Sequence, residues 1–359
     1  MDALTEKEEE GSPRPAMTIR RPGRALPGAR STKLFATVLV TPARLMLLFL
    51  IGFPAAVAIY ISFTNWSPTT GHIWYQAYKD FASYGFNNFW EALGGGEFWS
   101  AIWRTVIVTV LAVGVEFALG FTLALLFLKK FRGRSLLTLV FLLPMMVVPA
   151  VTGFIFYMLF QTQGPINDAL TVVLGNFLHI TGTVQIPWLT DPSIALFPVI
   201  MADIWQWTPL MFLIFMSGLA ALPEDQMNQA QILGAGYWFR LRYLILPMMK
   251  PIVLIALIIR AMEVFKLFDA AWLMTQGGPG DATTTVSVLL YRETFINARW
   301  GYTSAVAILI LIFVSVIAIR AIRPIETAQE ETLEGLMMVA EEPVETVRVD
   351  DAIEAEVTV

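Results

Sequence analysis

Six ionisable residues lie within stretches of sequence that are otherwise strongly apolar. They are Glu116, Asp203, Arg260, Glu263, Lys266 and Asp269. An ionisable side chain inside a membrane span is costly to bury, and such residues usually serve a function, for example in a solute pathway. These side chains are therefore the first candidates for chemistry in this chain.

Helical spacing places several of these residues on shared faces. Asp203, Gln206 and Trp207 follow an i, i+3, i+4 pattern, and Arg260 and Glu263 are three residues apart. Such faces could line a wet cavity in which carboxylate, amide and guanidinium groups hydrogen-bond a polar solute and an indole offers an aromatic face for stacking. The residues expected to line it are Asp203, Gln206, Trp207, Arg260 and Glu263, with Thr152 and Phe156 from a neighbouring stretch.

The same charges also permit a purely structural interpretation. Arg260 could pair with Glu263, and Lys266 with Asp269, as salt bridges that hold helices in register. Glu116 fits better as one side of a hydrogen bond between two helices. For the charged residues between 260 and 269, the sequence does not decide between lining a cavity and forming internal ion pairs.

Composition identifies an integral membrane protein. Hydrophobic residues make up 56% of the 359-residue chain, compared with about 45–50% in soluble proteins. The chain has no cysteine and two distant histidines, His72 and His179, so cysteine chemistry is impossible and a histidine metal centre is not expected. It contains neither a GxxxxGK[ST] phosphate loop nor a GxSxG elbow, so we expect no enzyme, no metal and no bound cofactor.

The apolar runs predict an all-α protein with six transmembrane helices. Each run is long enough to cross a bilayer, which takes about 20 residues. The expected spans are residues 36–63, 101–128, 136–160, 194–221, 252–274 and 302–322. Outside this membrane domain (36–322) lie a basic tail (1–35), expected to be disordered, and an acidic tail (323–359). The acidic tail is expected to be solvated and disordered, with a regulatory role as the alternative.

Lys and Arg residues indicate the orientation of the chain. They are frequent in the first tail, at residues 129–134 and in the segment 222–250, whereas the loops 64–99 and 161–193 contain Lys79 alone. Because positive residues favour the cytoplasmic side, both termini and the segment 222–250 are predicted to be cytoplasmic. The expected location is a bacterial cytoplasmic (inner) membrane, which the chain crosses several times.

The cytoplasmic segment 222–250 has the pattern of a polar helix between two spans. Pro223 suits a first helical position, and Glu224 and Asp225 suit the positive end of the helix dipole. Gly234 permits a bend, and Pro247 is expected to end the element. Such a helix would be offered to a partner; the alternative is a helix that lies on the bilayer surface.

This segment resembles the EAA loop of the permease subunits of binding-protein-dependent ABC importers. At the positions of the family pattern this chain has Asn228-Gln229-Ala230, Gly234 and Leu244-Ile245-Leu246-Pro247. The glycine, the hydrophobic pair and the proline keep the family's spacing, whereas Gln229 replaces an alanine. Asn228 replaces the acid that heads the family motif, so no salt bridge is expected there. The resemblance implies that a partner ATPase is contacted by Glu224, Asn228, Ala230, Gly234, Ala235, Leu246 and Pro247.

A second group of motifs is similar to the first permease of maltose, lactose and glycerol-phosphate importers. These motifs are Asp203-Ile-Trp205-Gln-Trp207-Thr-Pro209, Phe268-Asp269 through Gly277-Gly278-Pro279 with Thr283, and Tyr291, Phe295 and Gly301-Tyr302. The resemblance covers residues 36–322. It implies the type I ABC importer permease fold with six spans and a cytoplasmic coupling helix.

The resemblance also implies a complete transport complex. A second homologous permease, a dimer of ATPase subunits that binds ATP and Mg²⁺, and an extracytoplasmic solute-binding protein would surround this chain in the lipid membrane. The solute would be a sugar, a polyol or a related polar molecule, carried by alternating access; nothing suggests nucleic acid. The rival hypotheses are an ion-driven secondary transporter, which would work without an ATPase, and a lipid-modifying enzyme, for which no constellation of catalytic residues is visible.

Overall fold

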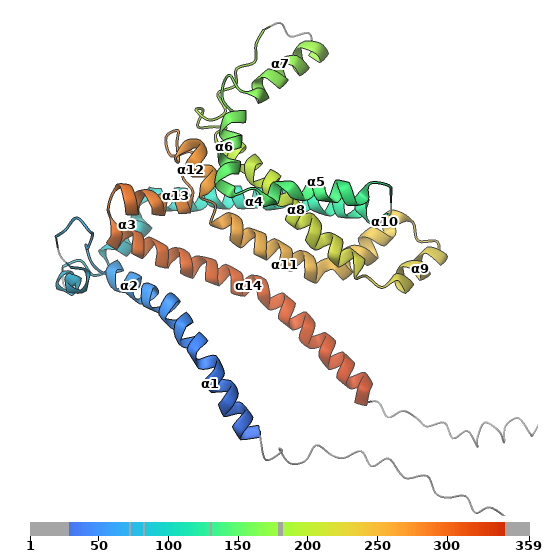
Figure 1. Cartoon of the computed structure of the whole chain (residues 1–359), viewed down its shortest axis with the longest axis horizontal. Helices are drawn as coiled ribbons and strands as arrows, with labels where there is room; N and C mark the ends of the chain where they lie inside the picture. Colours follow the sequence, from blue (N-terminus) through green and yellow to red (C-terminus); the bar gives the residue numbers. More distant parts are fainter. Residues whose placement is uncertain (1–28, 72, 82, 130, 179–181, 342–359) are drawn as a thin grey trace, which may run out of the picture. The chain divides into compact units, whose positions relative to one another are not determined.

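The computed structural model describes residues 29–71, 73–81, 83–129, 131–178 and 182–341, and every regular element within them is helical (Figure 1). Contacts divide the chain into two units, Met1–Val57 and Ala58–Val359. The first unit contains α1 (Ala29–Leu47), the π-helical turn η1 (Leu48–Gly52) and the start of α2 (Phe53–Ser62). Helix α1 begins within the tail expected to be disordered; residues 1–28 lie outside the described part.

The second unit contains the remaining elements. In chain order they are η2 (Trp74–Asp80), α3 (Asn87–Gly94), α4 (Gly96–Phe127), α5 (Arg134–Met146), α6 (Pro149–Leu159), α7 (Pro165–Leu178), α8 (Leu196–Ala220), α9 (Glu224–Ile232), α10 (Tyr237–Arg240), η3 (Leu241–Ile245), α11 (Leu246–Phe265), α12 (Asp269–Thr275), α13 (Val286–Tyr291), η4 (Arg292–Ile296) and α14 (Trp300–Glu341). Among the described residues, five helical stretches are long and apolar enough to cross a membrane: Thr37–Ser62, Gly96–Phe127, Leu196–Ala220, Tyr237–Thr275 and Trp300–Ala321.

The expected span 136–160 is two helices instead of one. Helices α5 and α6 meet at a bend of 94°, and counting them as one broken span brings the total to six. Val147 and Val148 are extended, and Pro149 is the first residue of α6. A proline disfavours helical geometry in the residue before it, so the Val148-Pro149 step ends α5 and lets α6 leave in a new direction.

Helices α4, α8 and α11 form the main core of the second unit. Gly120 lets α4 and α8 approach closely, because a Cβ atom there would lie 2.7 Å from the Cβ of Met211. Phe127 and Phe212 pack edge to face beside this contact, with 5.2 Å between ring centroids. The close approach of α4 to α8 fixes the depth at which polar residues of the two helices meet.

The segment 222–250 differs from the single helix expected between Pro223 and Pro247. Helix α9 ends at Ile232, and Gly234 takes a φ of 81°, which glycine adopts without strain. A second helix begins at Tyr237 and runs on through Pro247, with the π-helical turn η3 directly before the proline. The polar helix therefore ends just before Gly234, and Pro247 belongs to the following span.

The acidic tail was expected to be disordered from residue 323. Helix α14 instead continues to Glu341, so this part of the expectation is wrong. Residues 342–359 lie outside the described part of the chain.

Candidate functional site

Three charged residues from α4, α8 and α11 form the inner ion cluster: Glu116, Asp203 and Arg260. The Arg260 Nε donates to Glu116 Oε2 and its Nη2 to Glu116 Oε1, each at 2.7 Å. The same Nη2 donates to Asp203 Oδ2 at 2.9 Å. All three residues are buried, and the planar guanidinium fork suits a two-pronged carboxylate contact. The expected role of Glu116 as a bond between helices is confirmed.

Trp207 extends this cluster by one helical turn of α8. The guanidinium carbon of Arg260 lies over the Trp207 ring, 5.0 Å from its centroid. A cation near the face of an indole is attracted by the ring's quadrupole. Arg260 therefore holds the indole as well as the two carboxylates.

A cavity of about 240 Å³ opens beside the inner ion cluster. Its lining combines charged, amide and aromatic side chains with a short stretch of irregular chain. The lining residues are Pro149, Asp203, Gln206, Trp207, Arg260, Glu263, Lys266, Leu267, Phe268, Asp269 and Ala270. This composition can bind a polar solute by hydrogen bonds and offers an aromatic face for stacking.

Two interruptions of helices meet at this cavity. Pro149 starts α6 after the 94° bend, and residues 266–268 separate α11 from α12. The bend also frees the carbonyl of Val147, which accepts a hydrogen bond of 2.8 Å from Gln206 Nε2. Non-helical backbone at membrane depth is tolerated where it is buried in protein or lines a wet cavity. Transporters commonly bind their solutes at such broken helices.

The ion pairs expected within the fifth span are wrong. Arg260 pairs with Glu116 and Asp203 instead of Glu263, and Lys266 pairs with Glu263 at 3.3 Å instead of with Asp269. The Lys266–Glu263 pair is largely exposed. It borders the cavity but does not seal it.

Five of the seven residues expected in the cavity are brought together there: Asp203, Gln206, Trp207, Arg260 and Glu263. Thr152 and Phe156 are not among its lining residues. Both are buried in α6, where Phe156 packs against Trp205, with 5.7 Å between ring centroids. Rotation of α6 at the bend explains the difference.

Sequence reasoning missed several lining residues. They are Pro149, Leu267, Phe268 and Ala270; for Lys266 and Asp269, which also line the cavity, the sequence left open both a cavity role and an ion pair. Pro149 could have been found, because a proline inside an apolar run predicts a break. The backbone break at 266–268 has no comparable mark in the sequence.

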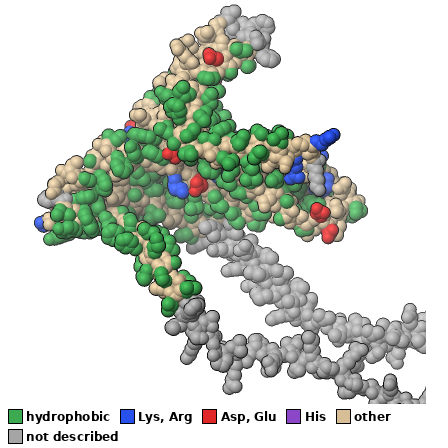
Figure 2. Space-filling model, in the orientation of Figure 1, with side chains coloured by type: hydrophobic (Ala, Val, Ile, Leu, Met, Phe, Trp, Pro, Cys, Tyr) green, Lys and Arg blue, Asp and Glu red, His purple; other side chains and the backbone are tan. Residues whose placement is uncertain are grey.

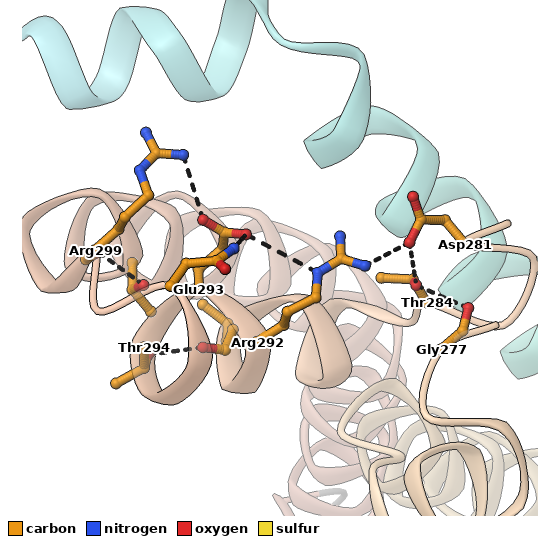
Figure 3. A network of polar contacts seen from close by, with 10 residues as sticks. Gly277, Asp281, Thr284, Arg292, Glu293, Thr294 and Arg299 are labelled. Atoms are coloured by element: carbon orange, nitrogen blue, oxygen red, sulfur yellow. Dashed lines mark hydrogen bonds and ion pairs between the residues drawn. The ribbon is translucent and has the colours of Figure 1, made fainter.

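A second set of charges, the outer ion network, lies outside the spans. It comprises Asp281, Arg292, Glu293 and Arg299, which Figure 3 shows, and Glu91 of α3. Arg292 contacts Asp281 and lies 4.0 Å from Glu293, and Arg299 contacts Glu293 at 3.3 Å and also Glu91. The hydrogen bond from Arg292 lowers the pKa of Asp281 below its ordinary value. The network joins the loop after α12 to η4 and α3.

This loop contains the Gly277-Gly278-Pro279 motif identified in the sequence. Thr284 Oγ1 donates to the Gly277 carbonyl at 3.0 Å, and Thr283 Oγ1 donates to the Gly278 carbonyl at 2.9 Å. The two threonines hold the loop against the start of α13. The Gly277-Gly278-Pro279 motif therefore forms a hydrogen-bonded turn next to the outer ion network.

The segment expected to contact an ATPase presents its side chains outward. Glu224, Asn228, Gly234, Leu246 and Pro247 are exposed, and Ala230 and Ala235 are partly buried. The neighbouring Ile232 and Leu233 are 84% and 86% exposed. Exposed apolar side chains of this size on a polar helix are typical of a surface that binds a partner.

Comparison with known proteins assigns the family. The profile of binding-protein-dependent transport system inner membrane components matches residues 116–326, more than half of the chain. The chain therefore belongs to this family. It is a permease subunit of a transport system, not an enzyme, and it crosses the inner membrane several times.

Relatives agree with this assignment. The probable ABC transporter permease protein y4oQ of Sinorhizobium fredii is 35% identical over 85% of this chain and 93% of its own length. The trehalose transport system permease protein SugA of Mycobacterium tuberculosis is 32% identical over 79% of this chain and 86% of its own length.

The fold also matches a solved structure. A chain of a bacterial ABC transporter that imports the acidic polysaccharide alginate superimposes with a TM-score of 0.65 at 19% identity, covering 82% of this chain and 95% of that one. The same transporter in complex with an alginate pentasaccharide-bound periplasmic protein gives a TM-score of 0.64 at 20% identity, covering 82% and 94%. The fold is that of the type I ABC importer permeases.

Proposed function

We propose that this chain forms half of the pathway of an ATP-driven importer for a sugar, a polyol or a related polar solute. The observation that carries the proposal is the cavity of about 240 Å³ at two broken helices, lined by acids, bases, an amide and an indole. The relative SugA is named for trehalose, a sugar, which supports this class of solute. Hydroxyl groups would bind to Gln206 and the charged side chains, and a sugar ring would stack on Trp207.

The exposed residues of α9 and the following turn support docking of an ATPase subunit. Ile232 and Leu233 are too exposed and too apolar to be left in water without a function. ATP and Mg²⁺ would be held by that partner, with a second homologous permease and a solute-binding protein completing the complex. The concentration of Lys and Arg supports a cytoplasmic location of α9 and of both termini, on the side where ATP is available.

Uptake by the reconstituted complex tests the cavity. Gln206→Ala and Trp207→Ala should each raise the KM for uptake by about tenfold, because one hydrogen bond or one stacking face is worth about 1–1.5 kcal/mol. Trp205→Ala is the matched control, since Trp205 is the same residue type on the same helix but packs on Phe156. Equal changes of KM in Trp205→Ala and Trp207→Ala would show that the solute does not bind in this cavity.

Docking of the ATPase needs a separate test. Leu233→Asp places a charge in the centre of the exposed apolar surface, so the ATPase subunit should no longer copurify. Ala substitution of Arg132, an exposed residue elsewhere on this side, is the control. Uptake that follows an ion gradient and continues without ATP would favour the secondary transporter instead.

A further inference from the structure

A groove of about 400 Å³ lies between the end of α4 and the beginning of the helix that follows Gly236. Its inner part is apolar and includes Phe121 and Leu125 from α4 and Leu241 from η3. Its outer part carries a cation, Lys129, beside the aromatic residue Trp238. An apolar channel with a cation and an aromatic ring at its mouth has the chemistry of a phospholipid site.

The groove lies at the level where two spans reach water. The span Gly96–Phe127 ends two residues before Lys129, and the span Tyr237–Thr275 begins beside Trp238. Tyr and Trp favour this boundary because their rings have an apolar body and a polar edge. No hydrogen bond between described residues uses the indole N–H of Trp238, which is 76% exposed. That donor is therefore available to a lipid headgroup.

Charge around the groove favours an anion. Residues 117–167 and 226–262 contain no Asp or Glu. The basic residues of these two stretches in the described part of the chain are Lys129, Arg132, Arg134, Arg240, Arg242, Lys250 and Arg260. Within that part, Lys129 takes part in no ion pair. Figure 2 shows Lys and Arg side chains gathered at the end of the molecule where α10 lies.

We propose that this groove binds one anionic phospholipid. An acyl chain would lie along Phe121 and Leu125, the phosphate would contact Lys129, and the Trp238 indole would donate to a headgroup oxygen. The basic residues alone would attract anionic lipids diffusely, whereas the groove supplies a single place with an apolar floor. Because Trp238 lies in the first turn of the helix that follows Gly236, the lipid would connect α4 to the helix that follows α9.

Native mass spectrometry of the full-length protein in detergent tests the proposal. The protein, with any subunits that copurify, is titrated with phosphatidylglycerol or with phosphatidylcholine of the same acyl chains. One tight phosphatidylglycerol per chain is expected, bound about fivefold more strongly than phosphatidylcholine, because one Lys near a membrane surface contributes about 1 kcal/mol.

Two pairs of variants separate a site from general attraction. Lys129→Ala should reduce the affinity for phosphatidylglycerol about fivefold, whereas Arg132→Ala, an exposed cation outside the groove lining, should change it less than twofold. Trp238→Ala should weaken binding of both lipids, whereas Phe239→Ala should not, since Phe239 is exposed but does not line the groove.

Three outcomes would overturn the proposal. Equal losses in Lys129→Ala and Arg132→Ala would mean diffuse electrostatic attraction. Equal affinities of the wild type for phosphatidylglycerol and phosphatidylcholine would show that the groove does not select an anionic lipid. Loss of the tight lipid when partner subunits are present would show that a protein covers the groove.

Discussion

The inner ion cluster and the outer ion network use the same kinds of ion pair in different surroundings. In the inner cluster at most 3% of any charged side chain is exposed, whereas Arg299 and Glu91 of the outer network expose 39% and 48%. Water screens the outer pairs, and exposed pairs contribute about 0–1 kcal/mol. A buried charge that loses its partner is far more costly. The comparison predicts that the cavity depends on its ion pairs much more than the outer surface does.

Geometry supports the same distinction. The inner cluster joins three helices that are distant in sequence, and its bonds of 2.7–2.9 Å fix the position of Arg260 below the indole of Trp207. The outer network follows a loop and short helices, where several contacts share each arginine. The first arrangement positions the groups that line the cavity, and the second joins a loop to short helices at the surface.

The largest expected effect is that of Arg260→Ala. The substitution leaves Glu116 and Asp203 buried beside each other without a cation, so it should reduce the free energy of unfolding by about 3–5 kcal/mol. Thermal unfolding in detergent measures it. Arg292→Ala in the outer network is the matched control and should cost less than about 1 kcal/mol. Similar losses in the two variants would contradict the comparison.

A smaller effect separates the two acids of the inner cluster. Glu116 accepts two hydrogen bonds from Arg260 and does not line the cavity, whereas Asp203 accepts one and does. Glu116→Gln should therefore cost about 1–2 kcal/mol of stability. Asp203→Asn should reduce stability by less. Two carboxylates surround one guanidinium in this cluster, so neutralising one of them removes the excess negative charge.

Uptake measurements complete this test. Asp203→Asn should raise the KM for solute, since it changes a cavity wall, and Glu116→Gln should leave the KM within about twofold when folded protein is compared. A larger KM change in Glu116→Gln than in Asp203→Asn would show that Glu116 acts on the solute.

Much of this arrangement could be predicted from the sequence, and the exceptions have physical causes. Apolar runs and helical spacing correctly brought Asp203, Gln206 and Trp207 to one face, because these depend on local periodicity. The partner of Arg260 could not be found in this way. Glu116 lies 144 residues earlier, and its contact depends on the close packing of distant helices.

Breaks in helices were the other source of error. Length and apolarity predicted one span over residues 136–160, whereas the Val148-Pro149 step turned α6 and took Thr152 and Phe156 away from the cavity. In the segment 222–250, Gly234 ended α9 and Pro247 was tolerated after a widened turn. In both places a single residue's backbone preference outweighed the side-chain pattern.

In the outer ion network, Arg299→Ala should have a modest effect. Arg299 contacts Glu91 and Glu293 and lies over the ring of Tyr302, 4.2 Å from its centroid. Arg299 itself is 39% exposed and Glu91 48%, although Glu293 is buried. Removing the Arg299 contacts should cost about 1–2 kcal/mol at low salt and less at high salt, since salt screens exposed charges. The Arg260→Ala loss should hardly change with salt, because buried pairs are shielded from ions. Thermal unfolding of Arg299→Ala and Arg260→Ala at two salt concentrations measures both effects. Equal salt dependence of the two variants would contradict the difference between exposed and buried ion pairs.

The smallest expected effect concerns pH and Asp281. Its pKa is lowered by the hydrogen bond from Arg292, so folding favours the ionised carboxylate. This contribution is fully present above the ordinary pKa of aspartate, about 4, and is lost as the pH falls through the lowered value in the folded protein.

At pH 7 the wild type should therefore unfold about 1–2 °C above Asp281→Asn, and the difference should shrink as the pH falls below about 4. In an Arg292→Ala background Asp281→Asn should have almost no effect at any pH, because the pair is already broken. A difference that does not shrink on acidification, or that persists in that background, would mean that Asp281 stabilises the loop through Thr284, 3.3 Å from its carboxylate, rather than through its charge.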